Sequence, residues 1–182
     1  MIFDTDDLYE GHDRIDLLLR LKAANPAFHM TAFCVQGLGT QEYWDSLPDW
    51  IECAAHGEFH PDSREAEHWS YEKAREVMMC TPRRLRGGWK SPGWQISDGT
   101  YEVLCEFGWW VADQPYNDGR RPPGLRCHRL DDFDHVHTHV MDWGSNGLNE
   151  SWPYLLDRVE RAESFQLISE VVRPWHPSAV AA

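Results

Sequence analysis

Two histidines, His56 and His60, stand four residues apart in the stretch HGEFHP at positions 56–61. Neutral imidazoles bind zinc and other divalent transition metals, and two of them on one helical turn face the same way. Exposed histidine pairs are common, so the pair alone is weak support for a metal site. A third ligand from a neighbouring segment would make the pattern more specific.

A group of acids near the amino end offers that third ligand. Asp4, Asp6 and Asp7 follow the apolar run at positions 1–3. While a strand continues, alternation places Asp4 and Asp6 on one face and Asp7 on the other, so the bend of the next loop decides their direction. Such acids could also cap the next helix or face solvent. With the two histidines, one carboxylate would form a His-His-Asp set, which leaves coordination positions for water, as a catalytic metal requires.

A later stretch, HVHTHV at 135–140, places His135, His137 and His139 on one face of a predicted strand. It is either a histidine-rich surface strand or the source of a proton donor for the metal site. His139 is nearest the carboxyl end of the strand, where reacting groups collect in parallel α/β folds. A donor must be protonated at working pH, so we expect a neighbouring carboxylate to raise the pKa of His139.

Alternating apolar runs and amphipathic stretches form the elements that must position these residues. Predicted strands cover 1–3, 28–35, 50–55, 84–90, 109–113, 135–140 and 164–172, and predicted helices cover 13–24, 40–47, 70–79, 97–108 and 149–162. This alternation favours a parallel sheet covered by helices, either an open doubly wound sheet or a distorted barrel. No G-x-G-x-x-G follows the first strand, so a dinucleotide site is unsupported.

The composition limits the classes of protein. A chain of 182 residues suits one domain, which we expect to span 1–182. A net charge of -13 argues against nucleic acid and anionic membranes as partners. The chain shows no membrane-spanning run and no leader, which predicts a cytoplasmic protein. Five cysteines without CxxC spacing predict free thiols. Ten tryptophans can fill a core or line clefts that stack on sugars.

The order of the motifs resembles the polysaccharide deacetylase family, the carbohydrate esterases with a NodB-like domain. TDD at 5–7 resembles the family's opening pair of aspartates, and MTAF at 30–33 resembles the strand that follows. HGEFHP resembles its His-Ser/Thr-x-x-His-Pro motif, with Gly57 in place of the hydroxyl residue. The likeness extends from Asp6 to His139 and is closer to small bacterial and phage-borne versions than to secreted chitin deacetylases.

Two further motifs of the family carry substitutions in this chain. KSPGW at 90–94 resembles Arg-x-Pro-Tyr/Gly, with Lys90 in place of the arginine. A lysine offers a point charge instead of a guanidinium fork. HTH at 137–139 resembles an apolar residue two positions before a histidine, with His137 in the apolar place, which implies a more polar pocket for the acetyl methyl group. Both substitutions imply a divergent branch with an unusual substrate.

The resemblance implies a distorted (β/α) barrel of about seven parallel strands and a metal-dependent deacetylase acting on an N-acetylated amino sugar or glycan. It implies one divalent metal, zinc first, with cobalt, nickel, manganese or iron as alternatives. The implied metal ligands are Asp7, His56 and His60. The implied catalytic residues are Asp6 as base, His139 as acid, Lys90 and Asp113 as their supports. The implied substrate contacts are Pro92, Trp94 and His137.

Two other functions stay open. One is a metal-dependent amidohydrolase that uses the same ligands on a non-sugar amide. The other is a catalytically inactive carbohydrate-binding relative that keeps the tryptophans Trp89, Trp94, Trp109, Trp110 and Trp143. The presence of both aspartates and both motif histidines argues against the inactive form. The oligomeric state is not predicted.

Overall fold

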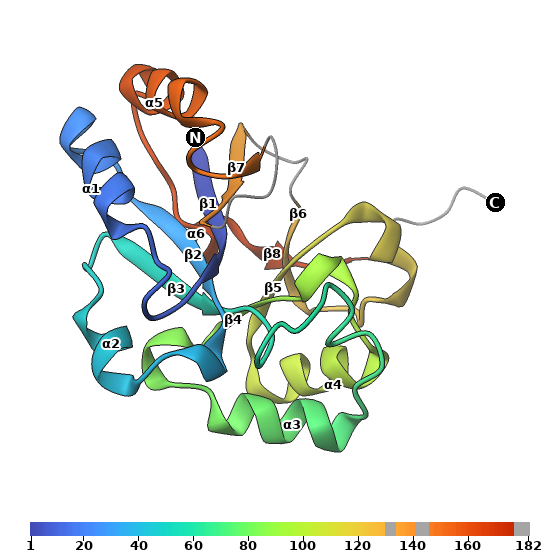
Figure 1. Ribbon diagram of the computed structural model, residues 1–182. Coiled ribbons are helices and arrows are strands. Elements are labelled where there is room, and N and C mark those ends of the chain that lie inside the picture. Colours follow the sequence, from blue (N-terminus) through green and yellow to red (C-terminus); the bar gives the residue numbers. More distant parts are fainter. Residues whose placement is uncertain (130–133, 141–145, 177–182) are drawn as a thin grey trace.

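A single curled sheet organises the protein in the computed structural model, which describes residues 1–129, 134–140 and 146–176 (Figure 1). Within these residues eight strands follow the order β7-β1-β2-β3-β4-β5-β6-β8. The strands are β1 (Ile2–Leu8), β2 (Met30–Cys34), β3 (Ile51–Ala55), β4 (Gly88–Lys90), β5 (Trp110–Asp113), β6 (Arg126–Arg129), β7 (His135–His139) and β8 (Arg173–Pro174). All neighbours pair in parallel except β8, which is antiparallel to β6.

Helices cover the outside of the sheet in two main pairs, α1 with α5 and α3 with α4 (Figure 1). The helices are α1 (Ile15–Ala24), α2 (Gln41–Ser46), α3 (Tyr71–Cys80), α4 (Asp98–Phe107), α5 (Trp152–Arg161) and α6 (Ile168–Val171). Thr40, Ser70 and Ser97 each accept a backbone N–H at the start of a helix, which explains where α2, α3 and α4 begin. None of the described helices has the length and hydrophobicity that a bilayer crossing requires.

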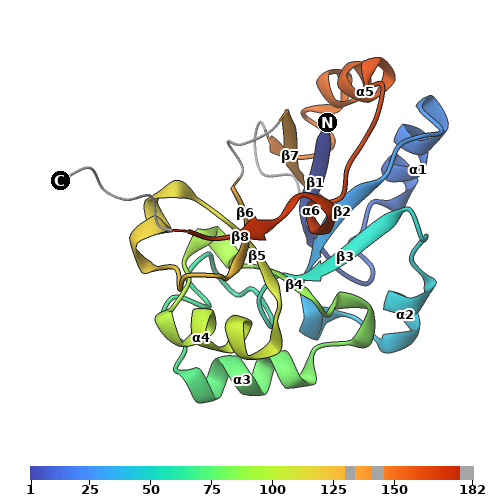
Figure 2. The same cartoon turned by 180° about the vertical axis from the view of Figure 1, so that it is seen from behind.

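Side chains alternate between the two faces of each strand, so the core has two layers. The outer layer beneath α1 and α5 includes Phe3, Met30, Ile51, Leu18 and Leu155. The inner layer comprises Ile2, Phe33, Ala54, Trp110 and Ala112, together with Ile168, Val171 and Val172 at α6. Figure 2 shows α6 and β8 in front of the central strands in the view from behind. The α6 segment therefore fills the inside of the sheet near the amino ends of the strands, where the backbone N–H of Ile168 donates to Thr31.

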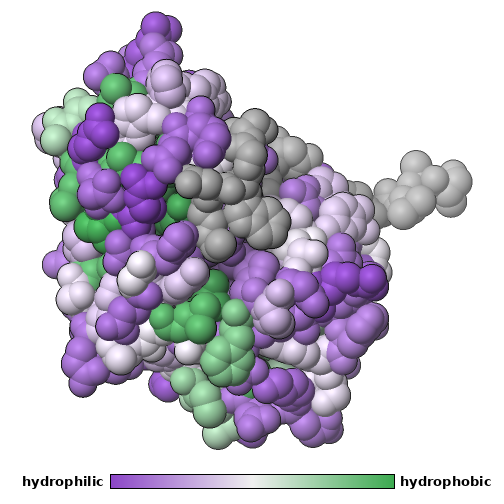
Figure 3. Space-filling view, viewed as in Figure 1, coloured by the Kyte–Doolittle hydropathy of each residue, from purple (hydrophilic) through white to green (hydrophobic). Residues whose placement is uncertain are grey.

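The sheet curls enough for its two sides to touch through side chains. His128 on β6 and His135 on β7 have ring centroids 5.2 Å apart, although these strands are not neighbours in the sheet. This curvature confirms the distorted β/α barrel that the motifs predict, with the strands parallel over most of its circumference. Hydrophilic side chains dominate the face shown in Figure 3, and hydrophobic ones gather in limited patches.

One predicted strand is wrong, and one strand of the sheet was not predicted. Residues 164–172 were expected to form a last strand, but they contain one bridge, between Ile2 and Gln166, and the short helix α6. The apolar residues Ile168, Val171 and Val172 recur at helical spacing, and the Glu170 side chain accepts the backbone N–H of Leu167 at the helix start. The strand β6 was not predicted, because its four residues begin and end with arginine and show no apolar run.

Candidate metal centre

A bulge at the end of β1 turns two consecutive acids toward the same place. The pairing register between β1 and β2 shifts between Thr5 and Leu8, and Asp7 has a left-handed backbone with φ of 64°. Bulges of this kind redirect side chains out of strict alternation. As a result, Asp6 Oδ2 lies 3.8 Å and Asp7 Oδ1 lies 3.6 Å from the same atom, His56 Nε2.

The candidate metal ligands Asp7, His56 and His60 come together at the carboxyl ends of β1 and β3. Their donor atoms all lie within 4.8 Å of one another. Asp7 Oδ1 is 3.3 Å from His60 Nε2 and 3.6 Å from His56 Nε2. Ligands about 2.0–2.1 Å from a tetrahedral zinc lie roughly 3.3–3.4 Å apart. Both carboxylate-to-imidazole distances are therefore close to the ligand separation of a zinc site.

His56 is held in the form that a metal ligand requires. Its Nδ1–H donates a hydrogen bond to the backbone carbonyl of Lys90 at 2.9 Å, which leaves the lone pair of Nε2 directed at the acids. A hydrogen bond from the distal ring nitrogen is typical of metal-binding histidines. Burial lowers the pKa of His56, against the attraction of Asp6 and Asp7, so the imidazole is neutral at neutral pH. The donor set and its protonation thus fit a divalent transition metal.

The loop between the two histidines is not the helical turn that their spacing suggested. Gly57 and His60 have left-handed φ angles of 71° and 50°. The Glu65 carboxylate fixes this loop by accepting the backbone N–H groups of Glu58, Phe59 and His60 at 3.0, 2.9 and 3.1 Å. A Cβ at Gly57 would lie 2.2 Å from Glu65 Oε2. Glycine at this position, where the family motif has a hydroxyl residue, therefore follows from the loop and its carboxylate anchor.

Lys90 lies directly against Asp6. Its Nζ donates to Asp6 Oδ1 at 2.7 Å and lies 4.2 Å from the centroid of the Trp94 ring. The Lys90 side chain is buried, as is that of Asp6. Burial opposes ionisation of Asp6, but the nearby positive charge, first of all that of Lys90, outweighs it and holds the pKa of Asp6 below its ordinary value. Asp6 is therefore an ionised, buried carboxylate.

Asp4 is a second buried carboxylate beside the site, and the sequence motifs gave it no role. It is fully buried, and its carboxylate accepts hydrogen bonds from His137 Nδ1 and, at 2.7 Å, from His135 Nε2. Burial raises the pKa of Asp4, but Lys90 and the two histidines lower it more, so its pKa lies well below the ordinary value. The inward alternation of β1 and β7, which pair in register, brings these side chains together. That alternation was the signal from which Asp4 could have been found.

His139 also faces the site, with Nε2 3.8 Å from Asp6 Oδ2. The expected rise in its pKa is wrong. Burial lowers the pKa of His139 and outweighs the attraction of Asp6. The imidazole is consequently neutral at neutral pH.

Asp113 does not lie with the histidines, contrary to the role that the resemblance implied. Its Oδ2 accepts from Tyr101 Oη at 2.5 Å and from Arg121 Nε at 2.9 Å, and its Oδ1 accepts from Asn117 Nδ2 at 2.7 Å. Alternation along β5 explains the difference, because Ala112 belongs to the inner layer and the next residue points outward, toward α4. Asp113 therefore ties β5 to α4 and the following loop.

The proposed substrate contacts Trp94 and Pro92 differ in burial. Trp94 is half-buried beside His137, with ring centroids 6.2 Å apart. Pro92 is buried, and its Cγ would lie 2.8 Å from a Cβ at Gly57, so it supports the metal-ligand loop. Other tryptophans of the carbohydrate-binding alternative are buried in the core, namely Trp89, Trp109 and Trp110. Trp143 lies outside the described residues.

A cavity of about 250 Å³ opens beside the candidate metal ligands Asp7 and His60. Its other lining residues are mostly apolar: Tyr9, Val35, Leu38, Phe59 and Pro61. Phe59 and Leu38 are exposed hydrophobic side chains, so the cavity has an apolar rim. The sequence did not indicate these residues, because they become neighbours only when the loops after β1, β2 and β3 meet.

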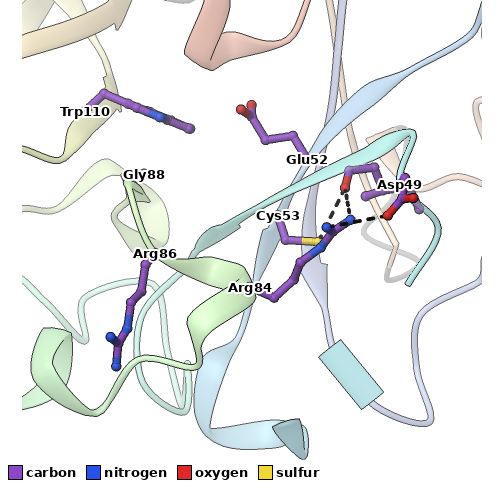
Figure 4. Close-up of a pocket in the computed structure, with 8 residues that line it drawn as sticks. Asp49, Glu52, Cys53, Arg84, Arg86, Gly88 and Trp110 are labelled. Atoms are coloured by element: carbon purple, nitrogen blue, oxygen red, sulfur yellow. Dashed lines mark hydrogen bonds and ion pairs between the residues drawn. The ribbon is translucent and has the colours of Figure 1, made fainter. Parts of the chain in front are cut away.

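Another cavity, of about 230 Å³, lies at the amino ends of β3, β4 and β5 (Figure 4). Figure 4 shows Arg84 turned toward Asp49 and the backbone at the start of β3. Arg84 donates to the carbonyls of Pro48 and Ile51 at 3.2 and 3.1 Å. This arginine is used to hold a loop, and the cavity is remote from the candidate metal ligands.

Known families and curated proteins gave no match to this chain, whereas solved structures did. The Xyl-CE4 domain of a multidomain xylanase from the hindgut metagenome of Trinervitermes trinervoides is 13% identical, with a TM-score of 0.59 over 97% of this chain and 93% of that one. A family 4 acetyl xylan esterase from Clostridium thermocellum, in complex with a cobalt ion, is 13% identical, with a TM-score of 0.52 over 92% of this chain and 89% of that one.

A CE4 family pseudoenzyme from Bacillus anthracis is also similar, at 13% identity, with a TM-score of 0.60 over 93% of this chain and 64% of that one. A mutant of that pseudoenzyme has restored enzymatic activity. Active and inactive proteins thus share this architecture, so the architecture does not decide activity. At this level of identity the likeness concerns the fold: the chain has the fold of the polysaccharide deacetylases, as its motifs predict.

Proposed function

We propose that this protein is a metal-dependent hydrolase that removes N-acetyl groups from an amino sugar or glycan. The observation that carries the proposal is the convergence of Asp7, His56 and His60 beside a second, ionised carboxylate, Asp6. The fold supports it, because CE4 structures include an acetyl xylan esterase in complex with a cobalt ion. The sequence motifs assign the same four residues to the same centre.

Asp7 and the two histidines would hold the ion, and zinc suits this mixture of imidazole and carboxylate ligands, as do cobalt, nickel, manganese and iron. When bound, a divalent ion lowers the pKa of a coordinated water and polarises a carbonyl oxygen. The hydrogen bond from His56 Nδ1 to the Lys90 carbonyl keeps the ligand atom of His56 in place.

Asp6 would take the proton from the attacking water. It is ionised because Lys90 lies 2.7 Å away, and it faces the ligand atom of His56 at 3.8 Å. A base must be unprotonated and within reach of the water, and Asp6 meets both conditions. Lys90 would therefore act as the support of the base.

His139 would give a proton to the departing amine. Because burial lowers the pKa of His139, its imidazole is neutral at rest and would have to receive that proton during the reaction before giving it to the amine. Asp6 holds the proton taken from water, and its Oδ2 lies 3.8 Å from His139 Nε2. Transfer between these two groups would return both to their starting state after each turnover.

The substrate would approach across the open carboxyl ends of the strands. The apolar cavity beside Asp7 and His60 is suited to an apolar part of the substrate, and the half-buried Trp94 offers a ring on which a sugar can stack. A non-sugar amide would use the same metal ligands and base. The identity of the substrate therefore has to come from a panel that includes both classes of amide.

The test is acetate release from N-acetylated sugars, sugar oligomers and simple N-acetyl amides by protein loaded with zinc or cobalt. Asp6→Asn should retain metal and lose turnover, because only the base is removed. Asp7→Asn should lose metal affinity as well. Acetate release that is equal in wild type and both variants, or absent from every substrate in the metal-loaded wild type, contradicts the proposal.

A further inference from the structure

Asp6 belongs to a second group of side chains that could bind a metal ion. Asp6, His137 and His139 place their donor atoms within 4.8 Å of one another. Asp6 Oδ2 is 3.8 Å from the Nε2 atoms of both histidines. The side chains of His137 and His139 are 26% and 20% exposed, so an ion can reach them from solvent. Two imidazoles and a carboxylate match the ligands of divalent transition metals.

The orientation of His137 supports this interpretation independently of the distances. Its Nδ1 is engaged by Asp4 Oδ1 and lies 3.4 Å from Lys90 Nζ, so Nε2 is the ring nitrogen that faces Asp6, at 3.8 Å. A carboxylate that accepts from the distal nitrogen of a metal-binding histidine is a recurrent feature of metal sites. Asp4 is itself fixed, because His135 donates to its other oxygen at 2.7 Å.

We propose that Asp6, His137 and His139 form a second, weaker site for a divalent transition metal such as zinc, adjacent to the site of Asp7, His56 and His60. An ion in this second site occupies the base and the acid of the proposed reaction. Excess metal therefore inhibits the enzyme. The inhibition depends on the proposed function, whereas the binding site does not.

Geometry and charge explain why the second site is the weaker one. Its imidazole-to-carboxylate distances are both 3.8 Å, whereas those to Asp7 are 3.3 and 3.6 Å, nearer to the separation in a zinc site. The Lys90 ammonium, 2.7 Å from Asp6, repels a cation there. An ion already bound by Asp7 adds to that repulsion. The sites should therefore fill in order, with the Asp7 site first.

The test is equilibrium dialysis of untagged protein against increasing zinc, followed by elemental analysis. Wild type should bind two ions in two resolved steps. His137→Phe should lose the weaker step and keep the stronger, and His60→Ala should lose the stronger. Asp4→Asn should weaken the second step about 10–100-fold, since it removes only the partner of a ligand. The control His68→Ala removes an 80% exposed histidine outside both groups and should bind as wild type does.

The binding result and the activity result separate the two proposals. The second site is refuted, whatever the activity, if wild type binds only one zinc ion. It is also refuted if the weaker binding step persists in folded His137→Phe. If His137→Phe does not fold, His139→Gln provides the same comparison. Two steps with the expected variants, together with no acetate release from any substrate, support the second site and refute the proposed function. With both correct, acetate release should fall at zinc concentrations that fill the second step.

Discussion

Replacing Lys90 by methionine tests the buried ion pairs that this lysine forms with Asp6 and Asp4. The Lys90 ammonium is buried, 2.7 Å from Asp6 Oδ1 and 3.7 Å from Asp4 Oδ1. Methionine fills a similar volume but leaves two buried carboxylates without this cation. Removing one partner of a buried ion pair typically costs about 3–5 kcal/mol. We expect that loss in the metal-free protein at neutral pH, which a domain stable by about 5–15 kcal/mol survives.

The stability loss in Lys90→Met should depend on pH in a direction that follows from the pKa of Asp6. A carboxylate with a lowered folded-state pKa stabilises the fold above its unfolded-state pKa, and this stabilisation is lost as the pH falls through the folded-state pKa. In wild type the charge of Lys90 lowers the folded-state pKa of Asp6, so Asp6 contributes this stabilisation at neutral pH. In Lys90→Met its pKa rises, so the variant should be most destabilised at neutral pH and less so as acid neutralises the carboxylate. The acidic limb of the pH–rate profile should move to higher pH.

The assay is urea unfolding in chelator at several pH values, together with the pH–rate profile of the metal-loaded protein. Lys90→Arg is the matched control, because it keeps the charge and has the residue of the family motif. It should leave the acidic limb near its wild-type position. A stability loss below about 1 kcal/mol with an unchanged limb in Lys90→Met would refute the reasoning, since a buried pair cannot be broken so cheaply.

Three further predictions concern the loop and the histidines. Gly57→Ser should destabilise the fold by about 1–3 kcal/mol, because residue 57 has a positive φ and its added side chain would meet Glu65. Thermal or urea unfolding measures the loss, and an unchanged stability would show that the loop adjusts. Glu65→Gln should weaken zinc binding at least about tenfold in a competition titration, because the charged acceptor of three loop N–H groups is lost. An unchanged zinc affinity would contradict this. His139→Ala should lower acetate release roughly a hundredfold while the tightly bound metal stays. If His137→Ala is the inactive variant and His139→Ala is nearly normal, the assigned acid is two residues out of register.

Much of the architecture follows from the periodicity of the sequence. The apolar runs predict most of the strands that carry the site, and Thr40 and Ser70, at the starts of two predicted helices, cap α2 and α3. The error at 164–172 arose because a short apolar segment was assigned by composition, although the spacing of Ile168 and Val171 is helical. Burial within the curled sheet decides between these alternatives, and a local pattern does not contain that information.

The site was predictable where it depends on strand ends and unpredictable where it depends on tertiary contacts. Strand ends bring Asp7, His56 and His60 together. The direction of the two acids depends on a bulge, which alternation cannot foresee. Glu65 belongs to no motif, because its partners are backbone N–H groups of a loop. Asp113, by contrast, could have been excluded from the sequence by applying alternation to β5.

The measurement that tests the metal centre most directly is a crystal structure grown with zinc, with the ion located by anomalous scattering. We predict that the strongest peak lies about 2.0–2.2 Å from Asp7 Oδ1, His56 Nε2 and His60 Nε2. The Nδ1 atom of His56 should still donate to the Lys90 carbonyl. A strongest peak away from these three atoms, or three side chains that point in different directions, would contradict the account.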